Sequence, residues 1–219
     1  KLRSARRSGK NISLTAWLIG IIARTVADHP RAAAYFQGKR TLKSFDQIKV
    51  ALLIEKTVNG EKVPLPLLID EANTKNPEEI TSLIARAVTM EGNADIITIN
   101  QSSGWLQHLY YHLPGSIRRL FWKVLIKKPD WAYGLMGNVS ISSLSGMGKI
   151  NGWFIHRSVH PISFGLGAVV KKPAIYEDQV CIREMLHFTV LLDHDLIDGA
   201  PMVRFVNDLI HRISEADGL

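Results

Sequence analysis

Apolar residues recur at helical spacing in three stretches of the chain. One helix is predicted over about 14–28, with Ser13 or Thr15 as its cap. A second is predicted after the Asn-Pro-Glu-Glu sequence at 76–79, because a capping residue, a proline and acidic residues favour the first turn of a helix. A third is predicted from Pro201, where it buries a stripe made of Met202, Phe205, Val206, Leu209, Ile210 and Ile213.

Alternating apolar and polar positions predict strands between these helices. Over 45–55, one face of the predicted strand carries Ile48, Val50, Leu52 and Ile54. Further strands are predicted at 138–144, 163–170, 174–176, 180–182 and 185–193. Helices and strands mix along the chain without an internal repeat or a low-complexity linker. The pattern therefore predicts one mixed α/β domain at 13–219, preceded by a basic segment at 1–12.

The composition is that of an ordinary folded domain and excludes several classes of protein. Hydrophobic residues make up 46% and charged residues 21% of the 219 positions, which excludes a disordered or collagen-like chain. The longest uncharged apolar run, at 14–23, is shorter than the ~20 residues that span a bilayer. The single cysteine, Cys181, excludes an internal disulfide framework and a multi-cysteine zinc site. There is no secretory signal pattern, and we expect a cytoplasmic location.

Basic residues are concentrated in two short segments. The net charge is +7, and ten of the 27 Lys and Arg residues lie within 1–10 and 118–128. Basic clusters attract anionic partners. Neither segment carries a zinc-finger, basic-zipper or ribonucleoprotein motif, so nucleic acid is not an expected partner. We expect the first segment to be a solvated, partly disordered end of the chain.

The segment at about 89–136 is rich in aromatic and basic residues and is predicted to be an insertion. A short helix is predicted within it, with one side made of Ile117, Leu120, Phe121, Val124 and Leu125. Three interpretations stay open. The segment is a helical excursion packed on the core, an amphipathic element on an anionic membrane surface, or a lid over a substrate pocket.

His194 stands where the last strand is predicted to end. Asp198 follows just ahead of the last helix, and Gly199 allows a tight turn between the two elements. An imidazole accepts a proton near neutral pH, and a nearby carboxylate fixes its geometry, so this pair suits a general base. Two further pairs of histidines at a spacing of four lack a third ligand, and no metal is expected at His108 with His112 or at His156 with His160.

The sequence at 194–199 fits the H-x-x-x-D-G motif of the coenzyme A-dependent acyltransferases. This superfamily includes chloramphenicol acetyltransferase and the catalytic domains of the 2-oxo acid dehydrogenase acyltransferases, and the flanking sequence favours the second group. Residues 137–144, Gly-Asn-Val-Ser-Ile-Ser-Ser-Leu, resemble its G-T-F-T-I-S-N-L-G strand, and residues 160–173 resemble its N-P-P-q-A-x-I-L-x-V-G-x-x-x-x-x-P stretch. The chain is most similar to free-standing relatives that read D-H-D rather than D-H-R at the motif.

The resemblance implies a chloramphenicol acetyltransferase-like two-layer sandwich, with a mixed β-sheet and flanking helices. It implies transfer of an acyl group between coenzyme A, or another thioester, and a thiol or hydroxyl on a small-molecule or carrier-bound acceptor. His194 would be the general base, Ser142 would hydrogen-bond the tetrahedral oxyanion, and Asp198 would hold the loop through an arginine. The family's enzyme is a homotrimer, or an assembly of trimers, in which different subunits supply His and Ser. If the segment at 89–136 is a lid, the phosphates of coenzyme A would be bound by Arg118, Arg119 and Lys123.

Three features depart from the family pattern. Asp195 stands where most members have arginine, and it adds a negative charge beside His194. No lipoyl domain, and hence no covalently bound lipoate, is expected in this chain. The usual arginine partner of Asp198 is missing, and the candidates to replace it are Arg3, Arg6 and Arg7. Two alternatives therefore stay open: a non-catalytic trimeric scaffold or membrane-associated protein of the same fold, and a dehydrogenase-complex subunit whose lipoyl domain lies elsewhere.

Overall fold

The computed structural model describes residues 2–7, 9–38, 40–58, 61–89, 112–144, 151–176 and 178–219. Its helices are α1 (Leu2–Arg7), α2 (Leu14–Asp28), the 3-10 helix η1 (Pro30–Ala33), α3 (Pro77–Thr89), α5 (Gly115–Ile126), α6 (Pro129–Met136) and α7 (Gly199–Glu215). Its strands are β1 (Tyr35–Gln37), β2 (Thr41–Lys43), β3 (Val50–Val58), β4 (Glu61–Ile69), β5 (Val139–Ser143), β6 (Ile162–Tyr176) and β7 (Gln179–Leu192).

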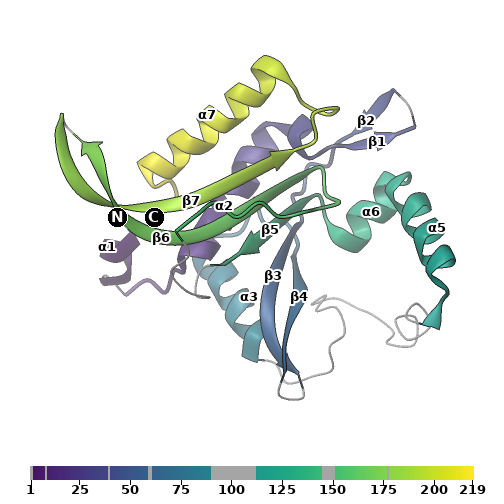
Figure 1. The fold of residues 1–219 in the computed structure, drawn as a ribbon, viewed down its shortest axis with the longest axis horizontal. Coiled ribbons are helices and arrows are strands. Elements are labelled where there is room, and N and C mark those ends of the chain that lie inside the picture. Colours follow the sequence, from purple (N-terminus) through teal and green to yellow (C-terminus); the bar gives the residue numbers. More distant parts are fainter. Residues whose placement is uncertain are drawn as a thin grey trace.

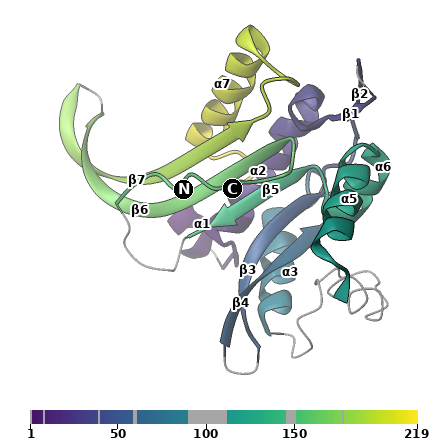
Figure 2. The same ribbon diagram turned by 45° about the vertical axis from the view of Figure 1, so that its right-hand side comes forward.

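A five-stranded mixed sheet forms one layer of the molecule, in the order β4-β3-β5-β6-β7. The inner strands β3, β5 and β6 run parallel, and the edge strands β4 and β7 are antiparallel to their neighbours. Helices α2, α3 and α7 cover one face of this sheet (Figures 1 and 2). The predicted two-layer sandwich, with a mixed sheet and flanking helices, is confirmed.

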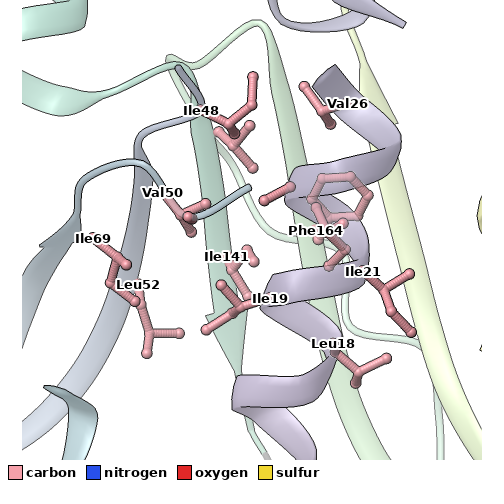
Figure 3. Close-up of a cluster of buried hydrophobic side chains, with 14 of the residues drawn as sticks. Leu18, Ile19, Ile21, Val26, Ile48, Val50, Leu52, Ile69, Ile141 and Phe164 are labelled. Atoms are coloured by element: carbon pink, nitrogen blue, oxygen red, sulfur yellow. The ribbon is translucent and has the colours of Figure 1, made fainter. Parts of the chain in front are cut away.

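The core lies between α2 and the sheet (Figure 3). Its fully buried side chains include Leu18, Ile19, Ile21, Ile141 and Phe164. On β3 the predicted alternation is also confirmed, since Val50, Leu52 and Ile54 are buried. Because successive strand residues point to opposite faces, the residues between these core positions point away from the helices.

Two predicted helix starts are confirmed by their caps. Ser13 Oγ accepts a hydrogen bond from the backbone N–H of Ala16 at 3.1 Å. At α3, Asn76 Oδ1 accepts from the N–H of Glu79 at 2.8 Å, and the Glu79 carboxylate accepts from the N–H of Asn76 at 3.0 Å. This reciprocal arrangement is a capping box, which satisfies backbone donors that the first helical turn leaves unpaired.

Strands β6 and β7 are longer than the sequence predicts. The predicted pieces at 163–170 and 174–176 are one strand, and those at 180–182 and 185–193 are another. Their ladder continues to Tyr176↔Gln179 with one irregularity at Leu166/Val169. The resulting hairpin extends as a curved arm beyond the rest of the sheet (Figure 1). Its outer part has no buried face, so the alternation that reveals a strand is lost there.

Other differences concern burial and the chain ends. Ile210 is exposed, contrary to prediction, because α7 turns the side that carries Phe205 and Leu209 to the core. Of the predicted apolar side of α5, only Leu125 is buried. The first basic segment forms helix α1 rather than an irregular end. Strands β1, β2 and β4 were not predicted, and residues 90–111 of the predicted insertion lie outside the described residues.

No helix in the described part of the chain is long and apolar enough to cross a membrane.

Candidate functional site

Ser142 lies on the face of the sheet opposite the helices. On β5, Ile141 is buried in the core, so its neighbours Ser140 and Ser142 point to the other face. Gly137 lies between the end of α6 and the start of β5, and its φ of 76° is in the left-handed region. A Cβ at this position would clash with the backbone carbonyl oxygen of Lys49, so a glycine is needed for β5 to start directly after α6.

Residues 151–160 cross the face that carries Ser142. Gly165 of β6 is paired with Ser142 in the parallel ladder. A Cβ on Gly165 would lie 2.7 Å from the carbonyl oxygen of Phe154 and 3.1 Å from Nδ1 of His156. The His156 imidazole therefore occupies the space above the strand position next to Ser142, and Gly165 leaves room for it.

A groove with a volume of about 500 Å³ opens between this crossing segment and the sheet. Its lining residues are Ala51, Leu53, Pro66 and Ser140 on the strands and Arg157, Ser158, Val159 and His160 on the crossing segment. Leu53 is paired with Ser142, so the groove reaches the strand position beside that serine. A largely apolar groove with one cation, Arg157, fits an elongated apolar ligand that carries an anionic group.

His160 fixes one wall of the groove. Its Nε2–H donates to the backbone carbonyl of Met136 at 2.8 Å, and its Nδ1 lies 2.9 Å from Oγ of Ser158. Burial lowers the pKa of His160, and the hydrogen bond to Met136 opposes that change. The ring is therefore neutral at pH 7 and binds the crossing segment to the end of α6.

His194 is exposed on the turn that joins β7 to α7. The backbone N–H groups of Leu196 and Ile197 donate to the carbonyl oxygen of Asp193 at 3.0 and 3.3 Å. The side chains of Leu196 and Ile197 are buried. These hydrogen bonds and buried side chains hold the turn against the core. The imidazole of His194 stays on the surface, accessible to another molecule.

The structure does not bring Ser142 and His194 together within one chain. The ladder aligns Val139 of β5 with Ile162 of β6 and with Leu192 of β7. Ser142 lies beyond this row in one direction, and His194 follows Leu192 in the opposite direction. The two rows are three strand residues apart, or ~10 Å at about 3.3 Å per residue, and β6 separates β5 from β7. His194 lies further on, in the turn two residues after Leu192. A single chain therefore cannot place both side chains on one reacting carbonyl.

Asp198 begins α7 and makes no capping hydrogen bond with its side chain. The suggested partners Arg3, Arg6 and Arg7 belong to α1, which lies near both chain termini (Figure 1). The C-terminal end of α7 is at that side of the molecule, since Trp17 Nε1 donates to the carbonyl oxygen of Asp217 at 2.8 Å. Within one chain, Asp198 is thus at the far end of α7 from the predicted arginines.

Sequence reasoning missed a group of polar side chains on the Ser142 face. Both ring nitrogens of His156, Nδ1 of His187 and Oγ1 of Thr189 are buried, without a hydrogen-bond partner among the described residues. Thr189 is paired with Gly165, so it lies in the same row as Ser142. Burial lowers the pKa of His156. The alternation of β7, which puts His187 and Thr189 on one face, was the available signal.

These unpaired atoms indicate a place for a polar occupant. Leaving a buried hydrogen-bonding group unpaired costs about 1–3 kcal/mol, and native proteins tolerate this mostly where another molecule or water supplies the partner. His187 already has one contact, since its Nε2 lies 2.9 Å from Nζ of Lys172. The face beside Ser142 therefore combines a hydroxyl, two imidazoles and an apolar groove.

The other candidates lie apart from this face. Arg118, Arg119 and Lys123 are on α5, which packs against α6, and their binding of coenzyme A phosphates stays a prediction. His108 lies outside the described residues. No group of three His, Cys, Asp or Glu side chains in the part of the chain that the structure describes could hold a metal ion. Cys181, in β7, is partly exposed.

Comparisons with known proteins agree with the motifs. Residues 137–219 match the family described as 2-oxoacid dehydrogenases acyltransferase (catalytic domain). The dihydrolipoyllysine-residue acetyltransferase component of the pyruvate dehydrogenase complex of Mycobacterium bovis is 30% identical over 93 residues. That match covers 40% of this chain and 16% of the relative, so the chain spans only a small part of that protein's length.

Solved structures show the same fold over nearly the whole chain. The cubic core of a pyruvate dehydrogenase multienzyme complex matches with a TM-score of 0.61 and 16% identity, over 98% of this chain and 73% of that chain. The dihydrolipoamide acetyltransferase of Azotobacter vinelandii matches with a TM-score of 0.62 and 15% identity, over 98% of this chain and 73% of that chain. In that enzyme a serine, a histidine and an asparagine were investigated for their role in catalysis.

The resemblance predicted from the motifs is confirmed. The matched segment contains Ser142, His194 and Asp198, and the fold extends over the residues that precede it. Residues 137–219 thus match the model of the 2-oxoacid dehydrogenase acyltransferase catalytic domain, and the chain as a whole has the fold of the solved catalytic domains.

Proposed function

We propose that this protein is an acyltransferase whose active site is formed by two copies of the chain. One copy contributes Ser142, and the other contributes His194. The observation that carries the proposal is the placement of these residues. They stand at the family's motif positions, yet the ladder register puts three strand residues, ~10 Å, and the intervening strand β6 between Ser142 and the end of β7 that precedes His194.

The spacing of the three residues supports their roles. In the Azotobacter enzyme the investigated histidine follows the serine by 52 positions, and the asparagine follows the histidine by four. Ser142, His194 and Asp198 have the same spacing in this chain. The third position differs, since an aspartate stands here where that enzyme has an asparagine.

The reaction is the transfer of an acyl group from coenzyme A, or another thioester, to an acceptor thiol or hydroxyl. His194 takes the proton of the acceptor as the acceptor sulfur or oxygen attacks the thioester carbonyl. The hydroxyl of Ser142 donates a hydrogen bond to the oxyanion of the tetrahedral intermediate. The intermediate then breaks its bond to the coenzyme A sulfur, and the departing thiolate receives the proton from His194.

The charges around His194 suit this cycle. Asp195 and Asp198 are both exposed beside the turn that carries the histidine. The imidazolium that forms during the reaction is a cation, and Asp195 adds a carboxylate to the same turn, where most relatives have arginine. The proposed mechanism does not require an arginine at this position.

The β6–β7 arm supports association of several copies. Its outer part exposes Ile175 and Val180, each 78% accessible, together with Ile182. Exposed apolar side chains on a hairpin favour burial against another chain. In the homotrimer that we propose, the arm and the turn of one copy would lie next to the Ser142 face of another. The similar fold of the cubic core of a pyruvate dehydrogenase multienzyme complex supports such an assembly.

The first test is calorimetric titration with coenzyme A and acetyl-coenzyme A, combined with sedimentation of the purified protein. We expect a trimer, or a multiple of three, that binds at micromolar strength, roughly −8 kcal/mol. His194→Ala should retain the assembly and the binding but lose transfer to dihydrolipoamide. A folded trimer that binds neither ligand would contradict the coenzyme A proposal and favour a non-catalytic scaffold.

A further inference from the structure

Helix α5 carries an apolar stripe with exposed side chains. Ile117, Leu120 and Val124 are exposed, and Leu120 is 61% accessible. At 100° per residue they lie, with Phe121, within an arc of about 100° on the helix surface. Leu125 lies outside this arc, and it is the buried residue of the helix. The side of α5 that packs on α6 is thus different from its apolar side.

A row of cations borders the stripe. Arg119, Lys123 and Lys127 follow one another at intervals of four residues, so they lie on one flank of the helix. All three are exposed, and α5 contains no acidic residue. The next helix, α6, adds Trp131, which is exposed and lies under the Lys128 ammonium at 4.3 Å from the ring centre. An aromatic ring with a cation beside it is typical of segments at membrane–water interfaces.

A second copy of the chain fits this surface poorly. In a two-fold contact the same patch meets itself, so the row of Arg119, Lys123 and Lys127 would face another row of like charges. Like charges in close apposition oppose association. Exposed apolar positions on other helices, such as Val203 and Ile210 on α7, stand among residues of both signs and carry no such row. Among the described helices, α5 alone combines exposed apolar side chains with charges that are all positive.

We propose that α5 binds an anionic membrane surface. Ile117, Leu120 and Val124 would enter the region between headgroups and acyl chains, while the cations would contact phosphate and carboxylate groups of the lipids. The helix would lie parallel to the surface, as amphipathic helices with basic flanks do. This inference is independent of the proposed chemistry, because neither Ser142 nor His194 lies on α5 or α6.

The test is co-sedimentation of the purified trimer with vesicles. Vesicles of phosphatidylcholine and phosphatidylserine in equal parts should pellet the protein, and phosphatidylcholine alone should not. Pelleting should decrease as salt is added, because screening weakens the attraction of surface charges. Neutralising cations with Arg119→Gln and Lys123→Gln should lower the partition coefficient roughly five-fold for each charge. Leu120→Ser should also lower it, because the apolar contribution is lost.

Matched controls come from α7. Arg204→Gln removes an exposed cation and Ile210→Ser removes an exposed apolar side chain, and both should pellet like the wild type. All the substituted side chains on α5 are exposed, so the melting temperature should not change and reports correct folding. Lack of pelleting with anionic vesicles would overturn the proposal. Variants on α5 that pellet like the wild type would also overturn it. Variants that lose coenzyme A affinity while their lipid binding is unchanged would instead assign the cations of α5 to coenzyme A.

Discussion

The two faces of the sheet differ in the kinds of atoms that they bury. The face under α2 and α7 is packed with aliphatic and aromatic side chains such as Ile141 and Phe164, both fully buried. The face crossed by residues 151–160 carries Ser142 and polar atoms of His156 and Thr189 that are buried without a partner among the described residues. The same strands form both faces, because their residues alternate from one side to the other.

The helix-covered face stabilises the fold, and the Ser142 face carries the candidate catalytic residues. Burial of apolar area under the helices is the main favourable term in folding. Unpaired polar atoms on the other face oppose folding, and proteins tolerate such local conflicts chiefly at functional sites. We therefore expect substitutions on the helix-covered face to change stability, and substitutions on the Ser142 face to change activity.

The largest effect is expected from Phe164→Ala on the helix-covered face. Removing this fully buried ring leaves a cavity, and such truncations lower the free energy of unfolding by about 3–5 kcal/mol. Denaturant unfolding measures the change. Tyr176→Ala, at the exposed end of the same strand, is the matched control and should change the free energy of unfolding far less. Equal losses of unfolding free energy in the two variants would contradict the prediction, because both ends of β6 would then contribute equally to stability.

Ser142→Ala should have a large effect on activity alone. Loss of one oxyanion donor lowers the rate by ~10²–10³. The melting temperature should be unchanged, because Ser142 is on the half-exposed face and makes no core contact. Ser140→Ala, two positions earlier on the same face, serves as the control and should retain most of the rate. A Ser142→Ala enzyme with normal turnover would remove this serine from the mechanism.

Thr189→Val should stabilise the protein slightly. The substitution keeps the shape of the side chain and removes a buried hydroxyl without a partner, which relieves a cost of about 1 kcal/mol or more. Differential scanning calorimetry without ligand should show a higher melting temperature. If the hydroxyl instead bonds a ligand or a second chain, the variant will melt lower once that partner is present. A lower melting temperature of the isolated variant would contradict the prediction.

A smaller decrease in stability is expected at acid pH. Burial lowers the pKa of His156 and of His160 below the ordinary 6.5 of histidine. The unfolded chain therefore takes up these protons first, so stability is complete above pH 6.5 and falls as the pH decreases through the folded-state pKa. His156→Phe should flatten the decrease of melting temperature between pH 7 and 5. His211→Gln on exposed α7 should retain the slope, and identical slopes for both variants would contradict the assignment.

The sequence was informative where the signal is local. The cap at Ser13, the capping box at Asn76 and the alternation along β3 follow from residues a few positions apart, and all three are confirmed. The motif at 194–199 is local as well, and it pointed to the family whose model matches residues 137–219. Periodicity could also locate α5, but it could not show whether the apolar side of the helix meets the core.

The site could not be predicted in full because its geometry depends on strand register. Nothing in the sequence near Ser142 reveals that Gly165 is its neighbour or that His156 lies above that glycine. The separation of Ser142 from His194 likewise follows from three aligned strands. Ile210 is a similar case on a helix. Periodicity placed it in the buried stripe of α7, but the width of that stripe depends on how the helix packs.

The most direct test of a site shared between two copies is complementation between two inactive variants. Ser142→Ala and His194→Ala are each purified alone as controls. The two variants are also co-expressed, so that mixed trimers form. In random mixing about a quarter of the sites combine an intact Ser142 from one copy with an intact His194 from its neighbour. We predict that each variant alone is inactive with acetyl-coenzyme A and dihydrolipoamide, while mixed trimers recover about that fraction of wild-type activity. Mixed trimers that form normally but stay inactive would contradict the shared site.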